Sequence, residues 1–224
     1  MTHTVHPFAH RLGVIRDWKS RWFSKRPAQY RENVMVDTTI RRFLKKRLRG
    51  NYVTSTEIER NEKQIRILIK TARPGLVIGR SGEGTVKLVK EIEKIAKTVP
   101  GSQGPRSVKL DIEEVRSPES QAPIVAWMVA EGLEKQQTFR RVLKQTVEKV
   151  MANRDVEGVR IAIGGRLGGA EMSRTEEIKR GRVPLQTIRA DIDFSREVAY
   201  LPYGVIGVKV WIYRGDIFSD KKGA

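Results

Sequence analysis

Gly79 and Gly82 enclose Arg80 and Ser81, and these four residues stand directly before a stretch with helical periodicity. Glycines at both ends of a turn let the backbone run close to a sugar-phosphate chain, because no side chain holds it away. The N-terminus of the following helix adds unpaired N–H groups and a partial positive charge, and Arg80 adds a full charge. Gly79, Arg80, Ser81 and Gly82 are therefore candidates for gripping a nucleic acid backbone. A plain glycine turn is the alternative, because glycines at this spacing are common.

The composition points to the same class of ligand. The chain has 224 residues, with 44 Lys and Arg against 26 Asp and Glu, and its formal net charge is +18. A soluble protein with such an excess repels itself unless a polyanion neutralises it, so nucleic acid is the leading partner. A solvated basic surface is the other interpretation.

Residues for catalysis and metal binding are scarce. The chain has no cysteine, and its three histidines lie within the first ten residues, where Pro7 interrupts any helix that would align them. Asp191 and Asp193 could chelate magnesium in a nuclease, because residues two apart on a strand face the same side. Pairing of Asp191 or Asp193 with arginines is the simpler expectation. We therefore expect no enzymatic activity, no metal site and no cofactor.

The residues around the glycine loop predict a compact α+β domain. The predicted elements are a helix at 38–50, strands at 53–60 and 64–70, a short helix before Gly79, a helix from Gly82 or Glu83, and a strand at 107–115. Asp37 or Thr38 would cap the first helix, and Ile65, Ile67 and Ile69 alternate along the second strand. This order around a G-x-x-G loop is typical of a KH domain, which clamps about four nucleotides with such a loop.

The second half of the chain has a different pattern. It predicts helices over 117–136 and 137–153, then strands at 158–165, 186–193 and 204–213. Helices followed by strands indicate a second α+β domain, with helices packed on a mixed or antiparallel sheet. The glycine-rich run at 164–169 lacks the dinucleotide-binding fingerprint. It is expected to be a strand–turn–strand from which Arg166 reaches RNA.

Five segments resemble the family of small-subunit ribosomal protein three, a universal protein of the subunit head. They are VHPFAHRLGVIRDW at 5–18, TARPGLVIGRSGE at 71–83, GGRLGGAE at 164–171, GRVPLQTIRADID at 181–193 and YGVIGVKVWIYRG at 203–215. The resemblance extends over nearly the whole chain. It implies a type II KH domain followed by a second α+β domain. Since the pattern changes near residue 117, we place a basic N-terminal arm at 1–16, the KH domain at 17–116, the second domain at 117–215 and a tail at 216–224.

The same resemblance implies partners and a second site. The partners would be small-subunit rRNA, mRNA and the neighbouring ribosomal proteins ten and fourteen. In this family, basic residues of the second domain hold or unwind message at the mRNA entrance, and the matching positions are Arg140, Arg141 and Lys144. These residues fall at i, i+1 and i+4 of one predicted helix and could grip a backbone without reading bases. A solvated helix face is the alternative. Contacts near Glu176 and Glu177 stay open, because the family often has aromatic residues there.

Further bases are candidates for rRNA binding. They are Arg11, Arg16, Lys19, Arg21, Arg41, Arg42, Lys45, Lys46, Arg166, Arg174 and Arg182. We expect a cytoplasmic, structural ribosomal protein that forms no homo-oligomer and binds no membrane, since no apolar run approaches the roughly 20 residues of a membrane span. A free-standing KH-domain RNA chaperone or regulator, found off the ribosome, is the alternative.

Overall fold

The computed structural model describes residues 5–61, 64–98 and 107–218. The chain divides into two compact units. One unit spans Trp18–Arg116, and the other combines the chain before residue 18 with the chain after residue 116. The segment between the predicted helix from Gly82 or Glu83 and the predicted strand at 107–115, and residues 219–224 of the predicted tail, lie outside the described residues.

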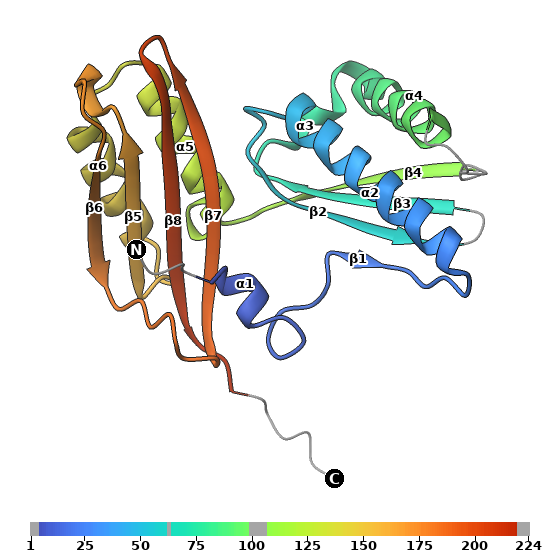
Figure 1. Ribbon diagram of the computed structural model, residues 1–224, viewed down its shortest axis with the longest axis horizontal. Helices are drawn as coiled ribbons and strands as arrows, with labels where there is room; N and C mark the ends of the chain where they lie inside the picture. Colours follow the sequence, from blue (N-terminus) through green and yellow to red (C-terminus); the bar gives the residue numbers. More distant parts are fainter. Residues whose placement is uncertain (1–4, 62–63, 99–106, 219–224) are drawn as a thin grey trace. The chain divides into compact units, whose positions relative to one another are not determined.

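The first unit has the element order predicted around the glycine loop (Figure 1). Its elements are β1 (Ser20–Arg21), α2 (Pro27–Arg47), β2 (Val53–Arg60), β3 (Gln64–Thr71), α3 (Pro74–Ile78), a 3₁₀ turn (Arg80–Gly82), α4 (Glu83–Thr98) and β4 (Ser107–Glu114). The sheet order is β1-β2-β3-β4, with β2 and β3 antiparallel and β3 and β4 parallel. Parallel neighbours need a crossover, and the segment with α3 and α4 supplies it. The predicted α+β KH arrangement is confirmed.

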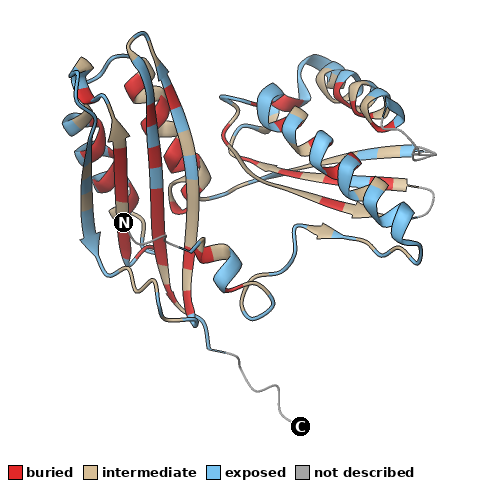
Figure 2. Cartoon of the chain, viewed as in Figure 1, coloured by how far each residue is buried: buried red, intermediate tan, exposed pale blue. Residues whose placement is uncertain are grey.

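Helices α2 and α4 cover one face of this sheet. Ile65, Ile67 and Ile69 of β3 are buried, as their alternation predicts, and they pack with Ile40 of α2 and Ile92 of α4. Figure 2 shows α2 buried along one side and exposed along the other. Burial of each such aliphatic side chain contributes about 1.5–3 kcal/mol, so this layer holds the helices on the sheet.

The opposite face of the sheet carries ion pairs. Arg66 contacts Asp111 at 2.6 Å and Glu59 at 3.5 Å, and Lys70 contacts Glu57 at 3.4 Å. The hydrogen bond from Arg66 lowers the pKa of Asp111. Acids and bases therefore neutralise each other on this face. The face adds little to the net positive charge of the molecule.

The first long helix begins earlier than predicted. Helix α2 starts at Pro27, which occupies a first-turn position where proline is well tolerated. Asp37 does not cap it but lies buried inside it, accepting hydrogen bonds from Trp22 Nε1 at 2.8 Å and from Arg60 at 3.2 Å. Burial raises the pKa of Asp37. The predicted start at residue 38 was therefore wrong, because α2 begins at Pro27.

The second unit is a four-stranded sheet whose two long helices lie on one face (Figure 1). Its elements are α1 (Pro7–His10), a 3₁₀ turn (Pro118–Ser120), α5 (Ala122–Glu134), α6 (Phe139–Met151), β5 (Gly158–Gly165), a 3₁₀ turn (Leu167–Gly169), β6 (Arg174–Gly181), β7 (Ala190–Leu201) and β8 (Gly204–Asp216). The strand order is β6-β5-β8-β7 and every pair is antiparallel. The predicted α+β architecture is confirmed here too.

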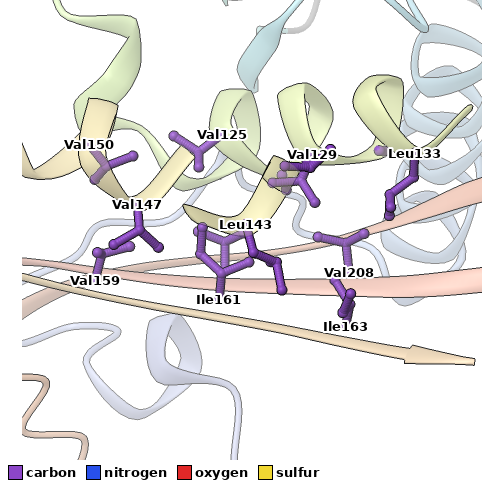
Figure 3. Packing of buried hydrophobic residues seen from close by; sticks show 14 of the residues in the cluster. Val125, Val129, Leu133, Leu143, Val147, Val150, Val159, Ile161, Ile163 and Val208 are labelled. Atoms are coloured by element: carbon purple, nitrogen blue, oxygen red, sulfur yellow. The ribbon is translucent and has the colours of Figure 1, made fainter. Parts of the chain in front are cut away.

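Apolar side chains of α5 and α6 interlock with those of the sheet (Figure 3). Val129 of α5 and Leu143 and Val147 of α6 pack against Ile161 and Val208, and all five are buried. These spacings place one stripe of each helix against the sheet. The other side of α6 is left at the surface.

Two strands differ from the sequence prediction. A strand was expected after the glycine-rich turn, and β6 is that strand. Its bounds were not predicted, because its Arg, Thr, Glu and Lys residues give little apolar periodicity; such charge is typical of an edge strand. Strand β7 begins at Ala190 rather than at residue 186 and continues to Leu201. Pro202 lies in the turn to β8, where the missing N–H is tolerated.

The described part of the predicted N-terminal arm belongs to this second unit. Arg11 is fully buried, and its guanidinium donates hydrogen bonds to the carbonyl oxygens of Ala190 at 2.6 Å, Thr187 at 2.8 Å, Leu185 at 3.0 Å and Pro7 at 3.1 Å. Burial lowers the pKa of Arg11. The structure thus contradicts the expectation that Arg11 is a surface cation for rRNA, because its donors are used inside the protein.

Replacing Arg11 with Met should destabilise the second unit by about 2 kcal/mol or more, because several buried carbonyls lose their donor. Hydrogen exchange of the β7 amides should accelerate, and denaturant unfolding should shift to lower concentration. Arg182→Met is the matched control, because Arg182 is exposed in the same unit. Equal stability of the two variants would show that the hydrogen bonds from Arg11 to the backbone carbonyls do not stabilise the second unit.

Candidate nucleic-acid interface

The loop at Gly79–Gly82 has a backbone that requires its glycines. Gly79 and Gly82 have φ of 73° and 81°, and Ser81 also lies in the left-handed region at 50°. Glycine adopts such angles without the steric penalty that a side chain brings. The sequence therefore places its two glycines where the turn between α3 and α4 demands them. Arg80 and Ser81 are exposed at the tip.

A third glycine, Gly84, holds the two helices at the loop together. A Cβ atom at this position would lie 2.6 Å from the carbonyl oxygen of Val77 and 2.8 Å from that of Ile78. Helix α4 can approach the end of α3 so closely only because residue 84 has no side chain. Sequence reasoning missed Gly84, although a glycine early in a helix, where it lowers helix propensity, was a usable signal.

Exposed apolar side chains flank the loop on both helices. Leu76 is 60% exposed and Ile78 38% on α3, and Val86 is 54% exposed on α4. Sequence reasoning assigned none of them to the interface. Apolar surface beside exposed backbone and Arg80 is suited to an unpaired nucleotide, whose base is apolar on its faces and whose phosphate is charged.

The bases of α2 divide into one structural residue and several surface residues. Arg41 is half-buried and donates to the carbonyl oxygens of Thr56 at 2.5 Å and Lys19 at 2.8 Å, which ties β1 and β2 to the helix. Burial lowers the pKa of Arg41. The structure therefore does not present Arg41 as an rRNA contact. The remaining candidates of this helix are exposed: Arg42, Lys45 and Lys46.

The outer side of α2 is basic in its C-terminal part, where the bases lie between Arg41 and Arg47. Its two acids are Glu32 and Asp37, and Asp37 is buried. Nearby on the preceding segment, Lys19 and Arg21 are exposed, and Arg21 contacts Glu59 at 3.3 Å. This surface can contribute charge to binding of a polyanion, with Arg21 partly neutralised.

The cluster predicted on the second domain lies on the exposed side of α6. Arg140, Arg141 and Lys144 are exposed, while Val142 and Leu143 of the same turns are buried against the sheet. The packing of α6 thus fixes the positions of three cations on the surface. Helical spacing predicted this side correctly.

The structure also brings together two arginines that the sequence placed in different groups. Arg140 of α6 lies 3.8 Å from Glu176, and Arg174 of β6 lies 3.4 Å from the same side chain. Both guanidinium groups lie over the ring of Phe139, at 5.7 and 5.5 Å. Arg174 therefore belongs with the α6 cluster, which sequence spacing could not reveal because α6 and β6 are separate elements.

The other candidates are distributed more widely. Arg16 forms an ion pair with Asp191. Arg166 is exposed but donates to the carbonyl oxygens of Ala170 at 2.9 Å and Tyr203 at 3.2 Å, so part of its hydrogen-bonding capacity is used to join its own turn to the turn between β7 and β8. Arg182 is exposed.

The two carboxylates considered for a nuclease pair with arginines, as expected. Asp191 is held by Arg16, and Asp193 contacts Arg214 at 3.1 Å and accepts a hydrogen bond from the Ala122 N–H at 2.8 Å. Each carboxylate therefore has a structural role. His3 lies outside the described residues, and His6 Nδ1 accepts a hydrogen bond from the Phe8 N–H at 3.2 Å.

The left-handed glycine loop and the adjoining helix of the first unit, together with the exposed cations of each unit, define a nucleic-acid-binding protein with a KH domain. Two family descriptions match the chain: "KH domain" over residues 39–120 and "Ribosomal protein S3, C-terminal domain" over residues 129–212. No helix within the described part of the chain has the length and apolar character needed to cross a membrane.

Curated relatives match the chain from end to end. It is 44% identical to small ribosomal subunit protein uS3 of Caldicellulosiruptor bescii over 100% of this chain and 97% of the relative. It is 42% identical to uS3 of Clostridium novyi over 99% and 96%, and 38% identical to uS3c of Chlorokybus atmophyticus over 99% and 98%. The chain belongs to the uS3 family of small-subunit ribosomal proteins.

Replacing Gly84 with Ala should destabilise the first unit by about 1–3 kcal/mol, because the methyl group forces α3 and α4 apart. Hydrogen exchange of the α3 and α4 amides would report this loosening. Gly75→Ala is the matched control: a Cβ there meets nothing within 4 Å, and stability should hold or rise slightly. A Gly84→Ala protein as stable as Gly75→Ala would contradict the close approach of the two helices.

Proposed function

We propose that this protein is a structural constituent of the small ribosomal subunit that binds small-subunit rRNA in the head. The observation that carries the proposal is the match over the full length to proteins named as small-subunit components. The distribution of charge supports it, because cations of both units are exposed while many acids are paired. The protein would act in the cytoplasm as part of the ribosome.

The glycine loop would bind RNA through its backbone. Gly79 and Gly82 allow a sugar-phosphate chain to approach, and Arg80 supplies a charge at the tip. Leu76, Ile78 and Val86 offer apolar surface to the attached bases. Recognition of this kind depends on shape and charge, so it suits an RNA segment whose bases are unpaired.

The cluster Arg140, Arg141 and Lys144 would hold or unwind message at the mRNA entrance. The exposed side of α6, fixed by its buried side, supports this role. Contacts with phosphate carry no sequence information. Such contacts suit a surface that must bind messages of every sequence.

The neighbouring ribosomal proteins ten and fourteen are proposed as protein contacts on the resemblance alone. A free-standing regulator remains the second candidate and would be found off the ribosome.

Replacing both Arg80 and Ser81 with Asp should weaken binding to small-subunit rRNA by about tenfold or more. A loss of this size is expected when one charge-assisted hydrogen bond is removed. The fold should be intact because both side chains are exposed. Filter binding would measure this, with Lys97→Asp and Thr98→Asp at the far end of α4 as the charge-matched control. Binding equal to that of the control would mean that the loop does not contribute to rRNA binding.

The unchanged protein should bind rRNA with a steep salt dependence in the same assay. If about 6–10 phosphates are neutralised, affinity should fall by about 10³–10⁵ between about 50 and 200 mM salt. A slope near zero would reject an electrostatic interface.

Replacing Arg140, Arg141 and Lys144 with Ala should spare assembly but slow translation through a message that contains a hairpin. Single-turnover translation of hairpin and unstructured templates would measure the difference. Arg140→Lys with Arg141→Lys keeps the charge and should retain most of the rate, because a non-specific grip needs point charges rather than bidentate geometry. Equal rates of the Ala variant on both templates would reject the entrance role.

A further inference from the structure

An acidic side chain lies within the basic cluster of the second unit. Glu176 of β6 lies 3.8 Å from Arg140 and 3.4 Å from Arg174. Its side chain is 29% exposed, whereas that of Arg140 is 73% exposed and that of Arg174 51%. The carboxylate thus lies beneath two arginines that reach the surface.

The neighbouring glutamate provides a built-in comparison. Glu177 is the next residue of the same edge strand, and successive residues of a strand face opposite sides of the sheet. Its carboxylate contacts Arg160 of β5 at 2.5 Å instead. The two glutamates therefore have the same chemistry and the same strand, but only Glu176 contacts the cluster that contains Arg140.

A carboxylate in this position competes with phosphate. Both groups are anionic oxygen acceptors for guanidinium, so RNA can take Arg140 or Arg174 only by displacing Glu176 or by binding beside its negative charge. Exposed ion pairs of this kind are weak and exchange readily. Phe139 lies under both guanidinium groups and keeps them near the surface during the exchange.

We propose that Arg174 is a fourth cation of the RNA-gripping cluster, and that Glu176 is an internal competitor that limits how tightly Arg140 and Arg174 hold RNA phosphate. This inference rests on the proposed role of Arg140, Arg141 and Lys144 and deepens it. A surface along which message must move needs contacts that release as easily as they form. Glu176 meets that need by offering each arginine a second partner.

The test is binding of a short fluorescent oligouridylate to the full-length protein at about 50 mM salt. Glu176→Gln should bind the RNA about threefold more tightly. This is the gain in affinity expected when one negative charge about 6 Å from a phosphate is removed in a solvated setting. The variant should also release the RNA more slowly. Arg174→Ala should weaken binding about as much as Arg140→Ala does. At about 1 M salt, where the screening length is about 3 Å, the gain of Glu176→Gln should vanish.

Glu177→Gln is the control, with the same charge change on the same strand, and it should leave the affinity unchanged. Glu176→Gln should also lose its effect when both Arg140 and Arg174 are Ala. The inference is overturned if Glu176→Gln binds no more tightly than the parent, if Glu177→Gln tightens binding equally, or if the gain persists without the two arginines.

Failure of this inference is distinguishable from failure of the proposed function. If the triple Ala variant at Arg140, Arg141 and Lys144 weakens oligouridylate binding while Glu176→Gln has no effect, only the competitor role is overturned. If the triple variant binds normally, the cluster does not grip RNA, and the proposed function of α6 and this inference fall together.

Discussion

With 44 lysines and arginines against 26 acidic residues, this chain can fold only if its cations are paired, separated or turned to the surface. The acids are placed accordingly. Asp37 lies inside α2 beside Arg60, Asp193 is held by Arg214, and Asp111 is held by Arg66. Each of these three pairs joins two elements, so these acids help to hold helices and strands together. The surplus positive charge remains for a polyanion.

Arginine consequently has two roles in this protein. Arg11 is enclosed by backbone carbonyls, and Arg41 ties β1 and β2 to α2. The guanidinium group suits this work because it offers five donors in a fixed plane. Arg80 and Arg141 are instead exposed. Arg141 lies on α6, which the buried Val142 and Leu143 hold against the sheet, and Arg80 lies in the turn between α3 and α4, whose Val77 and Leu88 are buried. Apolar packing therefore holds in place the elements that carry the proposed RNA surfaces.

The sequence predicted those features that depend on local pattern. Alternation of Ile65, Ile67 and Ile69 predicted a strand with one buried face, and the spacing of Gly79 and Gly82 predicted the loop. Helical spacing predicted the exposed side of α6. In each case the property follows from neighbours in the chain, and the periods of strand and helix decide it.

The features that the sequence did not predict depend on contacts between distant segments. The start of α2 at Pro27 was missed because residues 27–37 lack apolar periodicity, and the partners of Asp37 come from outside the helix. Residue type could not separate the buried Arg11 from an exposed arginine. The grouping of Arg140 with Arg174 exists only because β6 packs beside α6. The charged residues of β6 concealed the bounds of that strand.

Sedimentation of a native lysate through a sucrose gradient, in moderate salt and magnesium, tests the central claim most directly. Fractions would be probed for this chain by a specific antibody or by mass spectrometry. The account predicts that the chain migrates with small subunits and whole ribosomes, and that it leaves them only when salt is raised enough to displace phosphate contacts. A chain that stays at the top of the gradient would contradict the account and favour a free-standing KH-domain regulator.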